Sequence, residues 1–461
     1  MNAIEDFFHL KEHGTNFRTE LFAGLTTFMV MSYIIAVNPS ILTFNGALTI
    51  TQVATVTCLV AGIMSLAMGL YANRAIAIAP GLGLNAIVAF TLVGAMGLSF
   101  PEAMGVVVAE GLIITLLVLL GIREYVLDIV PLALKLAISV GIGFFILFIG
   151  LKNGGIIAFH SGLPGQDTGT LSGFLELAPL RTWPIFVTMI GLGITIVLHA
   201  RGVRGSILWG IVIATVAAFI VPGDVASFPN DPLAGPDFDL VGEFSFGFIS
   251  ELGVLTAILV VFSLMLADFF DTMGTLIGVG SQAGYLNEQG QFPDAKRPLL
   301  VDSLAAVAGG AASASSATSY IESAAGVSVG GRTGLVSVVP GLLFLLALPF
   351  VAIVNAVPAA ATAPALIIVG VLMVSVLSSG IAGGRGPIDF ADVEEAIPVV
   401  FTMLVMPLTF NITNGIGAGF VSYVLIKLAR GKARDVHPAL YVIAAAFLLY
   451  FLRWALFDAT F

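Results

Sequence analysis

Three carboxylates lie inside apolar stretches of the sequence that are long enough to cross a lipid bilayer. Asp268 and Asp271 belong to the stretch 253–282, and Glu322 belongs to the stretch 317–331. An ionisable group at the bilayer centre costs about 2.5 to 3.5 kcal/mol even on a lenient insertion scale, so such residues usually serve a pathway, a proton relay or a ligand. The chemistry that we expect from them is binding of a small polar ligand, transfer of a proton, or both.

The two aspartates belong to a polar stripe on the helix predicted at 253–282. The stripe comprises Asp268, Asp271, Thr275, Gly278 and Gln282, spaced by three, four, three and four residues. Residues at these spacings share one helix face, and the rest of the segment is mostly Leu, Ile, Val, Phe and Met. The stripe therefore faces the protein interior or a cavity. The alternative is structural, with the acids bracing neighbouring backbone.

Two segments interrupt the apolar pattern at matching places in the chain. Residues 79–86 read Ala-Pro-Gly-Leu-Gly-Leu-Asn-Ala, and residues 314–323 read Ala-Ser-Ser-Ala-Thr-Ser-Tyr-Ile-Glu-Ser. Proline and glycine are poor interior helix residues, and irregular backbone at membrane depth is tolerated only where protein or a water-filled cavity surrounds it. Paired broken segments indicate a transporter site, with Asn85 and Glu322 placed just after the breaks. Two continuous helices packed through small residues are the alternative.

Composition places the chain in the membrane class. The 461 residues are 58% hydrophobic and only 10% charged, and the mean hydropathy is +1.06. A soluble protein of this length needs far more polar surface. The single cysteine, Cys58, excludes an internal disulfide and argues against a cysteine metal site. We expect no cofactor, and no nucleic acid as partner because no basic stripe exists.

Fifteen apolar segments have about the length of a spanning helix. They cover residues 21–44, 50–71, 76–97, 101–121, 129–151, 183–200, 205–222, 253–282, 297–312, 317–331, 334–356, 361–380, 395–412, 414–430 and 438–457. The first fourteen complete a regular in–out series, and the last either spans the membrane or lies at its interface.

The predicted fold class is an all-α polytopic membrane protein in which residues 1–461 form a single transporter domain. The loop 223–251 divides about fourteen transmembrane segments into two inverted repeats of seven, 20–222 and 253–430, with broken third and tenth spans. Residues 438–457 add a C-terminal hydrophobic segment.

Loop charges predict a cytoplasmic N-terminus, because Lys and Arg in short loops favour that side. This orientation places inside the residues Lys11, Arg18, Arg74, Arg123, Arg201, Arg204, Lys296, Arg297, Arg332, Arg385, Lys427, Arg430, Lys432 and Arg434. The exceptions are Lys135, Lys152 and Arg181, whereas the loop 223–251, with six acids and neither Lys nor Arg, falls outside. Residues 1–19 do not resemble a cleavable signal peptide. We expect a multi-pass protein of the cell inner (plasma) membrane.

Other polar residues have simpler explanations. Glu110 is expected to pack against a partner helix, and Asp302, near the inner end of its span, to bond to loop backbone. Glu394 and Glu395 are expected to be helix-start acids. No histidine lies at the centre of a predicted span, so carboxylates would have to carry any coupled proton.

Three motifs resemble those of the AzgA-like purine nucleobase permeases. They are 80–86 (PGLGLNA), 267–275 (ADFFDTMGT) and 318–327 (TSYIESAAGV), and the opening 15–20 (TNFRTE) and 38–42 (NPSIL) also fit. The similarity runs over nearly the whole chain. It implies the wider nucleobase transporter superfamily, with a core and a gate domain and a substrate held between the broken third and tenth spans, facing the eighth.

The resemblance implies proton-coupled uptake of purine nucleobases, namely hypoxanthine, guanine or adenine. By motif position, Asp271 and Glu322 match the substrate-binding acids of the family. Asn85 and Gly83 match the residues that the third span of the family contributes to the substrate site. The expected substrate site comprises Asp271, Glu322, Asn85, Gly83, Thr275, Ser319 and Ile321. The expected proton-coupling acids are Glu322, Asp271 and Asp268, without a choice among them. The partners are a purine nucleobase, protons and membrane lipid, and a homodimer is compatible with the sequence.

Two rival functions remain open at this point. One is a transporter of the same fold for anions such as sulfate or bicarbonate, or for pyrimidines or xanthine. Against an anion as substrate, the two acids that face the break would repel it. The other is an intramembrane aspartyl protease, whose two carboxylates must share a proton. Asp268 and Asp271 lie one turn apart on one helix, which suits that chemistry poorly. The protein is therefore not expected to be an enzyme.

Overall fold

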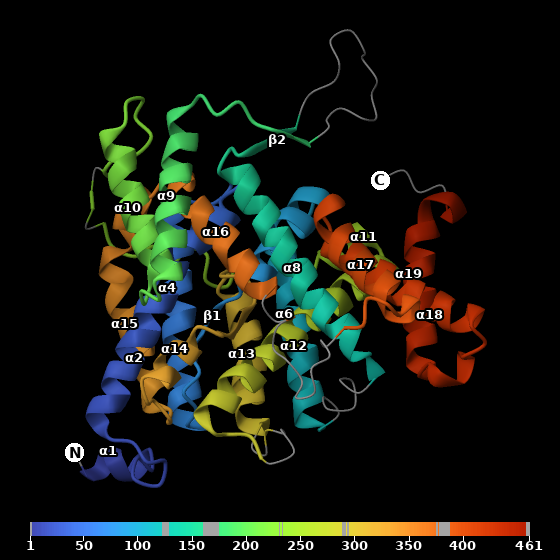
Figure 1. The fold of residues 1–461 in the computed structure, drawn as a ribbon, viewed down its shortest axis with the longest axis horizontal. Coiled ribbons are helices and arrows are strands. Elements are labelled where there is room, and N and C mark those ends of the chain that lie inside the picture. Colours follow the sequence, from blue (N-terminus) through green and yellow to red (C-terminus); the bar gives the residue numbers. More distant parts are fainter. Residues whose placement is uncertain are drawn as a thin grey trace.

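The computed structural model describes residues 2–121, 129–159, 175–229, 231–232, 234–287, 292, 295–374, 377 and 388–457. Arg123, Arg385 and the end of the predicted span 361–380 lie outside the described residues. The chain is mostly helical, with four short strands in the described part (Figure 1).

The elements of the first half run from α1 to α10, with two π-helical segments among them. They are α1 (Asn2–Phe7), α2 (Phe17–Met31), α3 (Ile34–Leu42), α4 (Ile50–Ala67), the π-helix η1 (Met68–Ala72), β1 (Ile78–Pro80), α5 (Leu82–Ala86), the π-helix η2 (Ile87–Ala95), α6 (Phe100–Leu119), α8 (Leu132–Asn153), β2 (Ile157–Phe159), β3 (Leu175–Leu177), α9 (Trp183–Ala200) and α10 (Ser206–Ile220).

The second half repeats the pattern of a long helix, a short strand and a short helix. Its elements are α11 (Phe248–Leu252), α12 (Val254–Ala283), α13 (Lys296–Ala311), β4 (Ala317–Ser319), α14 (Ser323–Ser328), α15 (Leu335–Ala347), the 3₁₀ helix η3 (Leu348–Ala356), α16 (Ala359–Val374), α17 (Val393–Leu408), α18 (Ile412–Ala429), the 3₁₀ helix η5 (Ala433–Asp435) and α19 (Pro438–Phe457).

Each predicted apolar segment corresponds to one or more of these elements. Within the described residues, eight helical stretches are long and apolar enough to cross a membrane, and four shorter apolar ones accompany them. The chain is therefore a multi-pass membrane protein. The first segment, predicted as one continuous span, is divided at Ser32–Tyr33 into α2 and α3. The third is strand, short α-helix and π-helix in succession.

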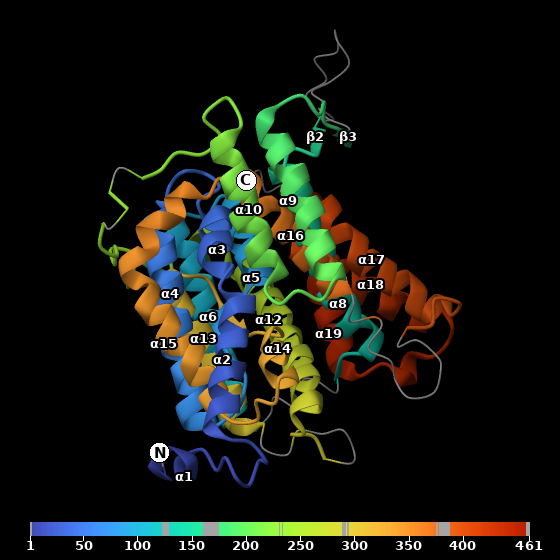
Figure 2. The same ribbon diagram turned by 60° about the vertical axis from the view of Figure 1, so that its left-hand side comes forward.

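The helices pack in two groups. In the first group α15 packs on α2 and α4, α14 packs on α2, and α6 and β4 pack on α13; in the second, α8 packs on α16, α17 and α18, and α9 packs on α10 and α16. Both views place α4 and α15 on one side of the molecule and α17, α18 and α19 on the other, with α12 between them (Figures 1 and 2). The two groups meet along α12 and α5, which both contact α8.

Candidate functional site

Two short antiparallel strands bring the broken segments together. Strand β1 pairs with β4 so that Ala79 lies opposite Thr318, although the two are far apart in the chain. Beyond the strands, the Gly81 N–H donates to the Ser316 carbonyl at 2.9 Å. A Cβ on Gly81 would lie 2.8 Å from the Thr318 methyl group, so glycine permits this close approach. The alternative of two continuous helices is therefore wrong.

A small cavity of about 60 Å³ lies beside the strand pair. Its lining comprises Tyr33, Gly81, Leu82, Gly83, Asp271, Thr275, Ser319, Tyr320, Ile321, Glu322, Val369 and Met373. Six of the seven residues predicted to bind substrate are in this lining; Asn85 is not in its described part. Val369 and Met373 come from α16, so both helix groups contribute. The volume is far below the roughly 300 to 1,000 Å³ of typical ligand pockets, so a ring-sized ligand requires the groups to separate.

Glu322 receives a hydrogen bond that the sequence did not predict. The Tyr33 hydroxyl donates to Glu322 Oε1 at 2.5 Å, and the Tyr33 side chain is buried. Tyr33 is positioned by the joint between α2 and α3, whereas Glu322 immediately precedes α14. In the sequence, Tyr33 is one of six hydroxyl side chains within the apolar segment 21–44, so nothing singles it out as a site residue.

Asp271 and Thr275 reach the cavity from the polar stripe of α12. Asp271 is half-buried and lies close enough to Glu322 and Asp302 to be repelled by both. A proton, or N–H donors of a ligand, would relieve this repulsion. Asp268, one turn earlier, is buried but is not in the described cavity lining. Its role in proton coupling stays a prediction.

Asp302 was assigned wrongly from the sequence. It is buried, and the backbone that it binds is that of the strand β4 rather than that of a loop. Its carboxylate accepts from the Ser319 N–H and from the Ser319 hydroxyl, each at 2.8 Å, and from the Thr272 hydroxyl at 2.6 Å. Asp302 thus holds the strand that forms one wall of the cavity. The sequence feature that could have identified Asp302 as a buried, bonded acid is its position within the apolar segment 297–312.

Asn85 is buried without satisfying its polar groups. Neither its amide nitrogen nor its amide oxygen has a hydrogen-bond partner in the part of the chain that the structure describes. A buried polar group left unpaired costs about 1 to 3 kcal/mol. The amide lies on α5, two residues after the cavity-lining Gly83.

The opening motif 15–20 has a structural explanation. The Asn16 side chain caps α2 by accepting from the Thr19 N–H at 3.0 Å. Glu20, one turn on, is fully buried and accepts from the Arg332 N–H at 2.7 Å and from the Thr333 hydroxyl at 2.6 Å. The motif therefore ties α2 to the loop that follows α14.

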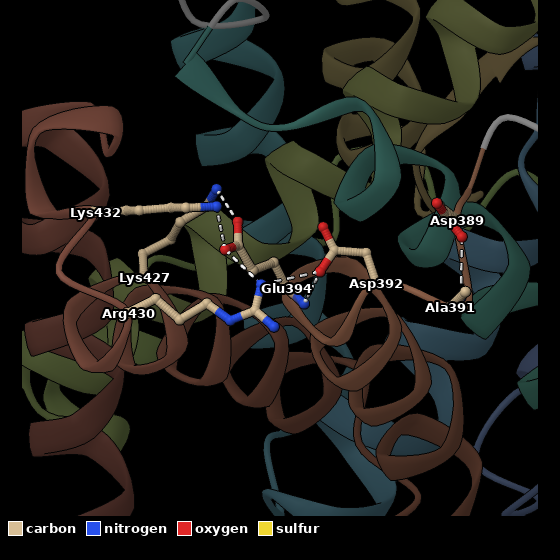
Figure 3. Close-up of polar contacts among 7 residues, drawn as sticks. All are labelled: Asp389, Ala391, Asp392, Glu394, Lys427, Arg430 and Lys432. Atoms are coloured by element: carbon tan, nitrogen blue, oxygen red, sulfur yellow. Dashed lines mark hydrogen bonds and ion pairs between the residues drawn. The ribbon is translucent and has the colours of Figure 1, made fainter.

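A cluster of ion pairs lies at the start of α17, and its residues are not in the described cavity lining. Glu394 binds Lys427 at 2.6 Å, Arg430 at 2.9 Å and Lys432 at 2.5 Å, and Asp392 caps the helix (Figure 3). Hydrogen bonds from these three cations lower the pKa of Glu394 to about 2. Glu394 is in the first turn of α17, as predicted, and it also joins α17 to the end of α18.

A larger cavity of about 400 Å³ lies between α6, α11 and α12. All of its described lining residues are apolar, from Ala109 to Met265. Because it offers no donor or acceptor to orient a polar ligand, the smaller cavity beside the strand pair is the candidate site.

The family of the chain follows from comparison with known proteins. The family model described as "Permease family" matches residues 18–418. The chain belongs to this permease family. Adenine permease AdeQ of Escherichia coli (strain K12) is 42% identical over 97% of this chain and 96% of its own length. Guanine/hypoxanthine permease PbuG of Bacillus subtilis (strain 168) is 38% identical over 97% of this chain and 99% of its own length. The resemblance to purine nucleobase permeases is thus confirmed, and the protein is a membrane transporter rather than a protease.

The fold is shared with more distant transporters. The transmembrane domain of a cyanobacterium bicarbonate transporter, BicA, superposes with a TM-score of 0.62 over 87% of this chain and 96% of that chain. The two sequences are 16% identical, so this likeness concerns the fold alone.

Proposed function

We propose that the protein takes up purine nucleobases, hypoxanthine, guanine or adenine, across the cell inner membrane together with protons. The observation that carries the proposal is the cavity at the strand pair, which Asp271 and Glu322 both line. The relatives named as adenine and guanine/hypoxanthine permeases support the substrate class.

The chemistry of a purine suits these two acids. A purine is flat, neutral and rich in N–H donors, and a carboxylate accepts from such donors. The Thr275 and Ser319 hydroxyls, in the same lining, can complete the pattern, Ser319 as an acceptor because its hydrogen is donated to Asp302. A base with a mismatched pattern leaves a buried group unpaired, which discriminates strongly.

Proton coupling follows from the same acids. A buried carboxylate that gains a proton outside and releases it inside would drive uptake, and Glu322, Asp271 and Asp268 are the candidates. An anion as substrate is disfavoured, because Asp271 and Glu322 would repel it. Pyrimidines or xanthine remain the alternative within the same fold.

The proposed architecture is fourteen spans in two inverted repeats, with the N-terminus in the cytoplasm. The first helix group would act as core and the second as gate, and their relative movement would open the cavity to either side in turn. Such rocking suits a cavity that residues of both groups line. A homodimer is compatible with this arrangement.

Uptake into proteoliposomes tests the proposal. Radiolabelled hypoxanthine, guanine, adenine and uracil are offered with and without an inward proton gradient. We expect the gradient to accumulate at least one purine, and Asp271→Asn or Glu322→Gln to abolish accumulation. Folded protein that accumulates none of these bases would contradict the proposal and make sulfate and bicarbonate the next ligands. Accumulation that ignores the gradient would overturn only the proton coupling.

A further inference from the structure

The contact between Tyr33 and Glu322 has a chemical asymmetry. The phenol has one hydrogen, which it donates to Glu322 Oε1 at 2.5 Å. An ionised carboxylate can only accept, whereas a protonated one can donate. The direction of this hydrogen bond can therefore depend on whether Glu322 carries a proton.

Tyr33 also faces the ligand cavity. Both Tyr33 and Glu322 are in its lining, and Tyr33 sits at the joint between α2 and α3 rather than within a regular helix. A donor that is released from Glu322 would thus be next to any molecule held there. A purine offers ring nitrogens, and in guanine and hypoxanthine a carbonyl oxygen, as acceptors for it.

We propose that Tyr33 is a hydrogen-bond donor to the substrate whose availability depends on the protonation of Glu322. While Glu322 is ionised, the phenol donates to the carboxylate. When Glu322 takes up a proton, its new O–H donates to the Tyr33 oxygen, and the phenolic hydrogen turns to an acceptor on the purine. The only covalent change is the O–H bond formed on Glu322. The inference rests on the proposed function and adds a means by which proton and base bind together.

Other ionisable groups face the same space and bear on the pH dependence. Tyr320 and Asp271 are electrostatic neighbours of Tyr33, and Asp302 is a neighbour of Asp271. The Tyr320 hydroxyl donates to the Pro80 carbonyl at 2.5 Å. A backbone carbonyl does not take up a proton in this pH range, so the direction of the Tyr320 hydrogen bond does not depend on pH, although Tyr320 lines the same cavity. It provides the matched control for Tyr33.

Binding measurements on the purified full-length protein test the inference. Radiolabelled hypoxanthine and adenine are titrated between about pH 5 and about pH 8. We expect wild-type binding to strengthen as the pH falls. Tyr33→Phe should weaken binding at low pH about tenfold, the effect of one lost buried hydrogen bond, and flatten the pH profile. Tyr320→Phe should leave the shape of the profile unchanged.

A double substitution separates donation to the base from mere orientation of Glu322. The Glu322→Gln side chain resembles the protonated acid at every pH. Tyr33→Phe added to Glu322→Gln should therefore still weaken binding about tenfold. Equal binding by Glu322→Gln and the double variant would show that Tyr33 acts only by orienting the carboxylate, and would overturn the inference.

Infrared difference spectroscopy of the ligand-free protein gives an independent test. During acid titration, the carboxylic C=O band that is missing in Glu322→Gln belongs to Glu322. We expect Tyr33→Phe to shift this band and Tyr320→Phe to leave it in place. An unshifted band in Tyr33→Phe would overturn the reversal of the hydrogen bond. If wild type binds neither base, the proposed function fails at that step, while this band still decides whether the hydrogen bond between Tyr33 and Glu322 reverses.

Discussion

The carboxylate of Asp302 accepts two hydrogen bonds from Ser319, one from the backbone N–H and one from the hydroxyl, each at 2.8 Å. Ser319 ends β4 and lines the cavity, whereas Asp302 lies on α13. Thr272 of α12 donates to the second Asp302 oxygen at 2.6 Å. One buried acid therefore ties the cavity wall to two helices without itself being in the described lining.

Asp302→Asn should impair both stability and transport. The substitution keeps the size of the side chain but replaces one acceptor oxygen by an N–H₂ group that must face a donor. We expect a loss of about 1 to 3 kcal/mol in the free energy of unfolding, seen as a lower thermal midpoint, together with reduced uptake. Ser303→Ala is the control, because among the described residues the Ser303 hydroxyl bonds within its own helix, to the Leu300 carbonyl at 2.9 Å. Wild-type uptake by Asp302→Asn would contradict the anchoring role.

The sequence predicts the local features of this protein better than its contacts. Span positions and the anomalous acids Asp271 and Glu322 could be recognised because hydrophobic length and an isolated charge are properties of neighbouring residues. The partner of Glu322 could not, since Tyr33 lies 289 residues away in the chain. Asp302 was misassigned for the same reason: its position in the span is local information, but its bond to β4 depends on how the two segments pack.

Asn85→Leu separates a structural role from a ligand-binding role. Because neither amide atom has a hydrogen-bond partner among the described residues, an apolar side chain of similar size removes an unsatisfied buried group. We expect the thermal midpoint of the ligand-free protein to stay equal or to rise. Purine uptake should nevertheless fall at least tenfold if the amide meets the base when the cavity widens, the size of one or two hydrogen bonds.

Asn38→Leu is the matched control for that prediction. Asn38 is equally buried, but its amide nitrogen donates to the Thr57 hydroxyl at 2.7 Å and to the Ala314 carbonyl at 3.2 Å. Asn38→Leu removes these two hydrogen bonds and should therefore lower the thermal midpoint. A similar drop in the Asn85 variant would mean that Asn85 has a structural partner, and unchanged uptake would exclude it from binding.

Glu394 should make the stability of the protein depend on pH in the acid range. Its pKa of about 2 in the folded protein is below the ordinary value of 4.5, so the folded state favours the ionised form. The resulting stabilisation is fully present above about pH 4.5 and is lost as the pH falls toward 2. Glu394→Gln should lower the thermal midpoint at pH 7 and show a smaller further drop on acidification than wild type. Glu251→Gln, at an exposed residue of α11, is the control. Parallel midpoint curves for wild type and Glu394→Gln would contradict the prediction.

Gly83→Ala should hinder the movement of the two helix groups against each other. A Cβ at Gly83 on α5 would lie 2.5 Å from Cγ2 of Ile142 on α8, closer than carbon atoms pack. Overpacking of this kind costs about 1 to 3 kcal/mol, and here it falls between the proposed core and gate. We expect uptake to fall about tenfold while the protein still inserts and folds.

A compensating substitution makes this prediction specific. Ile142→Ala removes the Cγ2 atom that the new methyl group would strike. In the Gly83→Ala background it should restore a large part of the uptake, although alone it leaves a void and lowers stability. Ile138→Ala, one helical turn away on α8 and also buried, should not rescue. Rescue by neither variant would mean that Gly83 is needed for its backbone approach to the substrate, because the clash with Ile142 would then be irrelevant to the defect.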